Sequence, residues 1–114
     1  MNFKPIAALL ALFPSFVLAA IKTTPVDYKD GDTSLQGFLV VDDAIQGDRP
    51  GIIIYPEWWG LNDYPKHRAE MLAKLGYVAF CADMYGKDKT TDDPKQAGQW
   101  MTPIKSDRQL MRRR

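Results

Sequence analysis

The sequence has almost no net charge and very little cysteine or histidine, and each of these scarcities excludes a kind of partner, cross-link or metal site. Fifteen basic and fourteen acidic side chains give a formal charge of +1, so there is no electrostatic basis for a nucleic-acid partner. A single cysteine, Cys81, excludes an internal disulfide, and its place in an apolar run favours a buried strand position over a reactive thiol. With one histidine, His67, the chain cannot assemble a zinc site of familiar spacing.

Recognisable catalytic motifs are also missing. The sequence contains no glycine-flanked serine or cysteine of the G-x-S-x-G type and no glycine-rich phosphate loop. His67 stands between Lys66 and Arg68, which predicts an exposed helix face rather than a catalytic base. We therefore predict no metal and no bound cofactor, and we find no nucleophile.

No apolar run is long enough to cross a bilayer comfortably, which takes roughly 20 residues. Ile6 to Leu18 is apolar apart from Pro14 and Ser15, with Lys4 before it and the small pair Ala19-Ala20 after it. This pattern is typical of a signal peptide, so we predict a cleaved signal at residues 1–20 and export to the periplasm or the exterior. We expect no stable membrane association after cleavage. An uncleaved anchor is the alternative.

The order of strand and helix signals predicts an α/β domain in residues 21–114. Val26 to Lys29 and Leu35 to Val41 flank the turn Asp30-Gly31-Asp32, which predicts an antiparallel hairpin. Ile52 to Tyr55 and Tyr77 to Ala82 are apolar without alternation, as in parallel strands covered on both faces. Hairpin and strands together predict a hairpin that leads into a parallel βαβ unit.

The segment between the two apolar runs predicts the crossover helix. Ala69, Leu72, Ala73 and Gly76 recur at helical spacing, and Asp63 is the expected N-cap.

A further helix should begin at Asp92-Asp93-Pro94 and be broken or kinked by Pro103. Ile104 to Arg114 resumes as helix in this prediction. We interpret the terminal run Arg112 to Arg114 as a solvated helix face rather than a functional basic tail.

The loop Glu57-Trp58-Trp59-Gly60-Leu61-Asn62 is the main candidate for chemistry, since α/β enzymes bind ligands at the carboxyl ends of strands. Glu57 is either a partly desolvated proton carrier beside the tryptophans or a solvated carboxylate, free or paired with Arg68. Trp58 and Trp59 either wall a substrate pocket or pack in the core. Adjacent side chains of an extended loop diverge, so we expect one for each purpose. Gly60 permits a tight turn.

This loop, together with Gly76-Tyr77-Val78-Ala79 and Asp83-Met84-Tyr85-Gly86, resembles the dienelactone hydrolase family of the α/β-hydrolase fold. The resemblance covers residues 28–114 and implies an incomplete α/β-hydrolase, in which residues 21–114 form the truncated N-terminal part of the domain. Pro56 departs from the many relatives that carry histidine there, and it removes a backbone donor at the strand end.

The resemblance implies hydrolysis of a small lactone or other carboxylic ester by a Cys or Ser, Asp and His triad without a cofactor. Glu57 would modulate the nucleophile, the backbone N–H of Trp58 would be an oxyanion donor, and Trp58 and Trp59 would contact substrate. Cys81 does not match the family's nucleophile. The triad belongs beyond Arg114, so we expect a chain that is inactive alone. The alternatives are a domain completed by a second chain, or a small-ligand-binding module that uses the Trp58-Trp59 loop.

Overall fold

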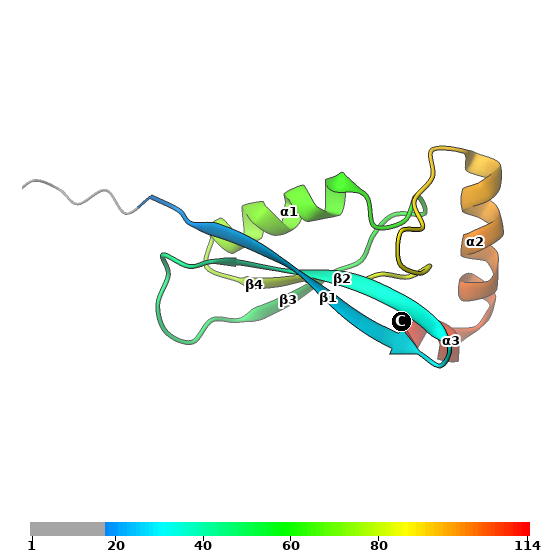
Figure 1. Cartoon of the computed structure of the whole chain (residues 1–114), viewed down its shortest axis with the longest axis horizontal. Helices are drawn as coiled ribbons and strands as arrows, with labels where there is room; N and C mark the ends of the chain where they lie inside the picture. Colours follow the sequence, from blue (N-terminus) through cyan, green and yellow to red (C-terminus); the bar gives the residue numbers. More distant parts are fainter. Residues whose placement is uncertain (1–17) are drawn as a thin grey trace, which may run out of the picture.

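The computed structural model describes residues 18–114 and contains one four-stranded sheet in the order β1-β2-β4-β3 (Figure 1). Residues 1–17, and with them most of the predicted signal peptide, lie outside the described part. The elements in chain order are β1 (Ile21–Asp30), β2 (Thr33–Asp42), β3 (Gly51–Ile54), α1 (Asp63–Lys74), β4 (Val78–Cys81), α2 (Pro94–Ser106) and α3 (Arg108–Arg113).

The predicted hairpin is confirmed as β1 and β2, paired antiparallel from Ile21 opposite Asp42 to Asp30 opposite Thr33. Both strands are longer than the apolar runs indicated. Polar residues such as Thr23 and Thr24 pair through their backbone, so the ladder continues where hydrophobic alternation stops. Gly31 has φ +57°, the left-handed conformation that the turn requires.

The βαβ unit is also confirmed, since β3 and β4 run parallel and α1 connects them. The small residues Ala69 and Ala73 are fully buried and let α1 lie close against one face of the sheet. The helix begins differently from the prediction: Asn62 is the N-cap, without a side-chain bond, and Asp63 lies in the first turn. The core cluster consists of Val40, Leu61, Ala69, Ala73, Ala79 and Cys81.

The prediction that β3 is covered on both faces is wrong for the described residues. Ile52 and Ile54 pack against the core beneath α1, whereas Ile53 is 58% exposed and the following Tyr55 is 60% exposed. β3 is an edge strand, hydrogen-bonded only to β4 in the sheet formed by residues 18–114. β3 therefore carries more apolar side-chain surface than this sheet buries.

Helix α2 begins as predicted, with the Asp93 carboxylate accepting the Lys95 N–H at 3.0 Å and Pro94 in the first turn. Pro103 does not break the helix, which runs on to Ser106. Because Pro103 lies in the last turn and is exposed, its missing N–H costs one backbone bond and its ring meets solvent.

The terminal arginines are not all solvated, which corrects the sequence interpretation. Arg113 and Arg114 form ion pairs with Asp30 at 2.9 and 2.7 Å, and the Arg114 guanidinium also donates to the Met84 carbonyl at 3.1 Å. The bonds from Arg114, and then those from Arg113, hold the pKa of the Asp30 carboxyl below its usual value. Only Arg112 of the three is free of such contacts within residues 18–114. The ion pairs hold α3 against the β1–β2 turn, at the end of the sheet where α2 and α3 lie (Figure 1).

Candidate functional site

The four carbonyl groups of residues 57–60, in the loop after β3, all accept hydrogen bonds, two from within the loop and two from other segments. Glu57 O accepts the Gly60 N–H at 3.2 Å, and Trp59 O accepts the Thr91 N–H at 3.0 Å. Trp58 O accepts the phenol O–H of Tyr85 at 3.0 Å, and Gly60 O accepts the N–H of Asn62 at 2.9 Å. By contrast, the N–H of Trp58 donates to no acceptor within residues 18–114. The Trp58 N–H is therefore available to donate to a bound group.

Gly60 makes this arrangement possible, as the sequence predicts. Its φ is +88°, a conformation that side chains rarely adopt, and a Cβ there would overlap the carbonyl oxygen of Lys89. The loop is therefore pressed against the segment that leads to α2.

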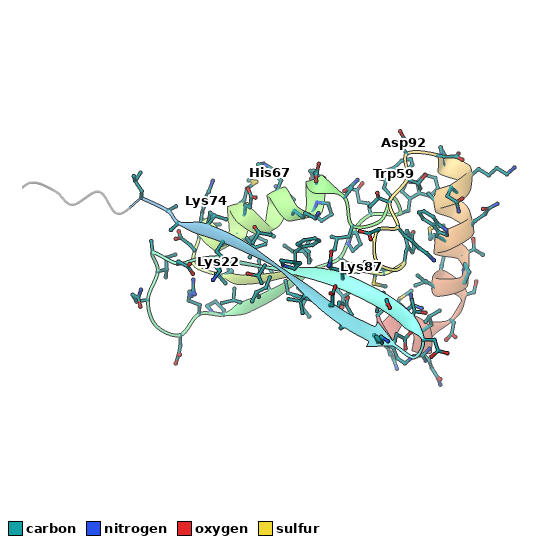
Figure 2. All side chains as sticks on the ribbon, in the orientation of Figure 1. Lys22, Trp59, His67, Lys74, Lys87 and Asp92 are labelled. Carbon is teal, nitrogen blue, oxygen red and sulfur yellow. The ribbon has the colours of Figure 1, made fainter. Side chains whose placement is uncertain are left out.

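The two tryptophan rings lie against each other, with centroids 4.9 Å apart and planes tilted by 57°. The expectation that they diverge is therefore wrong, because the turn at Glu57–Gly60 brings both rings to one side. Trp58 is 37% exposed and lines a groove, while Trp59 is half-buried beside the segment before α2 (Figure 2).

An apolar groove of about 590 Å³ separates this loop from the two C-terminal helices. The sequence did not indicate it, because the apolar residues of α2 and α3 have the spacing of ordinary core positions. The wall from the loops consists of Tyr55, Pro56, Glu57, Trp58, Met84 and Tyr85, and the wall from the helices of Met101, Ile104, Lys105, Met111 and Arg112. The groove suits an apolar group of substrate size, with charged residues at its margin.

Glu57 is exposed at the edge of this groove. Among residues 18–114 the ion pairs are Lys87 with Asp27 and the two arginines with Asp30, so Glu57 is not paired with Arg68. The geometry thus corresponds to the solvated carboxylate of the two alternatives that the sequence left open.

Asp83 is the organising residue that sequence reasoning passed over. It is 2% exposed, and its carboxylate accepts the backbone N–H groups of Gln36 at 3.1 Å, Tyr85 at 3.1 Å and Gly86 at 3.0 Å. The Tyr28 hydroxyl accepts the N–H of Asp83 at 2.9 Å. The available signal was an aspartate followed by Met-Tyr-Gly at the end of a buried strand.

Cys81 and His67 lie where the sequence places them. Cys81 is fully buried, its Sγ lies 3.5 Å from the Pro65 carbonyl, and burial raises its pKa to about 11, so it is no nucleophile. His67 is exposed on α1 (Figure 2). Within the described residues no cluster of three His, Cys, Asp or Glu side chains could hold a metal. No helix between residues 18 and 114 has the length and apolarity to cross a membrane.

The sequence model of the dienelactone hydrolase family matches residues 35–114. This chain belongs to the dienelactone hydrolase family. A dienelactone hydrolase-like promiscuous phosphotriesterase from metagenomic libraries is 39% identical, with a TM-score of 0.75 over 82% of this chain and 39% of that one. The structure of m3DLH is also 39% identical, with a TM-score of 0.73 over 78% of this chain and 37% of that one.

A curated relative, protein usf of Aquifex pyrophilus, is 30% identical over 69% of this chain and 34% of its own length. The chain thus spans about a third of that relative. These matches confirm the family resemblance and the fold, a mixed α/β sheet that forms part of an α/β-hydrolase domain.

Proposed function

We propose that this chain supplies the oxyanion loop and an apolar substrate wall to a carboxylic-ester or lactone hydrolase of the dienelactone hydrolase type. The observation that supports this most is the loop after β3, whose four carbonyls all accept hydrogen bonds while the Trp58 N–H has no acceptor within residues 18–114. The nucleophile, Asp and His would lie on polypeptide outside these 114 residues. The chain would then be inactive alone.

In this mechanism the loop acts when a Cys or Ser attacks the ester carbonyl carbon. Negative charge develops on the carbonyl oxygen, and the Trp58 N–H would donate to it together with the N–H of the residue after the nucleophile. Glu57, exposed beside the groove, would contact the nucleophile and modulate its ionisation. The groove would receive the apolar part of the ester against Trp58 and Tyr55.

Phosphotriesters are a second substrate class to test. A relative that is 39% identical is a promiscuous phosphotriesterase. A phosphoryl oxygen also gains charge in the transition state, so the same N–H donor would serve it.

The missing catalytic polypeptide would join the sheet at β3. This strand is at the edge, its neighbour on one side is β4, and Ile53 is 58% exposed. A nucleophile-bearing strand paired with β3 would place its carboxyl end beside Trp58. That strand would belong either to a longer form of this chain or to a separately encoded second half.

The test is co-expression of residues 21–114 with the C-terminal remainder of the 39%-identical phosphotriesterase. The proposal predicts a complex that hydrolyses 4-nitrophenyl acetate, while either part alone does not. The matched control is the same pair carrying Gly60→Ala, which distorts the loop and should remove activity. A stable complex without esterase activity would contradict the proposal.

We also propose export, on the strength of the leader pattern at residues 1–20. Expression of the whole chain in a bacterium should yield a periplasmic or secreted product whose first residue is Ile21. A cytoplasmic product that keeps Met1 or Asn2 would exclude this.

The second candidate function is a binding module, which the groove of about 590 Å³ favours. Because Trp58 lines the groove, a bound aromatic or sugar ligand should change its fluorescence saturably, and Trp58→Phe should abolish the change. An unsaturable response across both ligand classes would exclude this candidate.

A further inference from the structure

Tyr85 connects the loop at residues 57–60 to the loop that follows β4. It lies in the loop after β4, is 8% exposed, and donates its phenol O–H to the Trp58 carbonyl at 3.0 Å. Its ring packs against Trp100 of α2, with centroids 5.6 Å apart. Of the four bonds that hold the carbonyls of residues 57–60, this is the one made by a side chain.

We propose that Tyr85 is a positioning residue that fixes the Glu57–Gly60 turn and so aims its backbone donors. The inference rests on the proposed function, in which the Trp58 N–H stabilises an oxyanion. It assigns a role to a residue outside the loop itself.

Peptide geometry explains how a bond to a carbonyl aims a donor. In a trans peptide the C=O and the following N–H point in opposite directions. The Tyr85 phenol therefore fixes the plane of the Trp58–Trp59 peptide and turns the Trp59 N–H away from the protein. The Trp58 N–H belongs to the preceding peptide, whose Glu57 carbonyl accepts the Gly60 N–H, so Tyr85 acts on this donor through the neighbouring peptide plane and not directly. The two bonds hold consecutive peptide planes of a single turn.

Tyr85 is itself rigidly held, which a positioning residue must be. The Asp83 carboxylate accepts the Tyr85 and Gly86 N–H groups through one oxygen and the Gln36 N–H of β2 through the other. The turn after β3 is thus connected to β2 across the sheet through Tyr85 and Asp83. Charge-assisted bonds of a buried carboxylate are stronger than neutral ones, so this connection is stiff.

The protonation of Tyr85 suits the role. Burial raises the pKa of the phenol above its ordinary value of 10.0, so the hydroxyl keeps its proton and remains a donor at neutral and mildly alkaline pH.

The competing explanation is that Tyr85 serves only to pack against Trp100 and line the groove. Tyr85→Phe separates the two, because phenylalanine keeps the ring and removes only the hydroxyl. The matched control is Tyr64→Phe on α1, where the tyrosine is 56% exposed.

Amide hydrogen exchange of the whole chain, read at single-residue resolution by NMR or fragment mass spectrometry, tests the hold on the loop. We expect Tyr85→Phe to speed exchange at Gly60, Asn62 and Thr91 about fivefold, the effect of losing one net hydrogen bond. Amides of α1 and β2 should change less than twofold, and Tyr64→Phe should change none of these. Unchanged loop exchange overturns the proposal, and so does a uniform acceleration throughout the chain.

Activity of the completed hydrolase supplies the second readout. Tyr85→Phe should lower kcat roughly tenfold and leave KM unchanged, because the oxyanion forms only in the transition state. Faster loop exchange with an unchanged kcat would overturn the catalytic side of the proposal. An inactive wild-type complex would contradict the proposed function instead, and the exchange result would still decide whether Tyr85 holds the turn.

Discussion

Single residues of the loop show which features a sequence can reveal. The need for glycine at position 60 and the burial of Cys81 follow from neighbours in the chain, and both predictions are confirmed. The bond from Tyr85 to the Trp58 carbonyl joins residues 27 positions apart, so no local pattern indicates it. The contact between the Trp58 and Trp59 rings depends on the conformation of the turn, so the sequence does not indicate it either.

Gly60→Ala should lower the free energy of unfolding by roughly 2 kcal/mol, since a side chain at φ +88° is strained and its Cβ meets the Lys89 carbonyl. Gly98→Ala is the control, because nothing lies within 4 Å of a Cβ at that helical position. Alanine there should stabilise by about 0.5 to 1 kcal/mol. Urea denaturation measures both, and equal effects would contradict the loop geometry.

Cys81 should make stability fall in alkali. Its pKa is about 11 in the folded chain against an ordinary 9.0, so the unfolded chain loses the proton first. The stability that the buried thiol contributes is complete below pH 9 and is lost as pH rises toward 11, by roughly 3 kcal/mol at 1.36 kcal/mol per pKa unit. Cys81→Ala should flatten the dependence of the unfolding free energy on pH between pH 9 and 10. An unchanged slope would mean that the thiol is not desolvated.

The sequence predicts the secondary-structure elements that depend on neighbouring residues. It does not predict the arrangements that depend on residues far apart in the chain. The hairpin, the βαβ unit and the start of α2 follow from hydrophobic runs, turn residues and a capping aspartate. The docking of α3 does not, because it depends on Asp30, which lies 83 and 84 positions before its two arginine partners.

Asp30→Asn should therefore release α3 from the hairpin. The carboxylate that pairs with Arg113 and Arg114 is lost, and trypsin should cut at Arg108 and Arg112 several-fold faster. Asp32→Asn, an exposed change in the same turn, is the control and should leave the rate unchanged.

The same release should occur in acid. The Asp30 pKa is held below its ordinary value of 3.8, so the docking is complete above about pH 4 and is lost as pH falls through the lowered pKa. Equal trypsin cleavage of Asp30→Asn, Asp32→Asn and the wild type would show that the ion pairs do not hold the helix.

At the scale of the whole molecule, the sheet has a surplus of apolar surface. The sequence predicts β3 as a doubly covered strand, and this would hold if a further strand and helices packed beside it. Within residues 18–114, the face of β3 that carries Ile53 is exposed to solvent, and the outer edge of β3 has no strand paired with it. An open apolar edge invites pairing with other chains.

Ile53→Lys should thus reduce self-association of the isolated chain. A lysine on the edge strand disfavours strand pairing, so the monomer fraction at fixed concentration should rise several-fold in light-scattering chromatography. Leu75→Lys replaces a side chain that is 76% exposed at the end of α1 and is not part of β3, so it should have no effect. The same response to both changes would indicate general solubility rather than edge pairing.

The most direct test of the account is a chimera in which residues 35–114 replace the matching segment of the 39%-identical phosphotriesterase. The measurement is kcat/KM for 4-nitrophenyl acetate. If the Trp58 loop is an oxyanion loop, the chimera should retain activity within about tenfold of the parent, and Gly60→Ala should remove it. A folded chimera with no esterase activity would contradict the account.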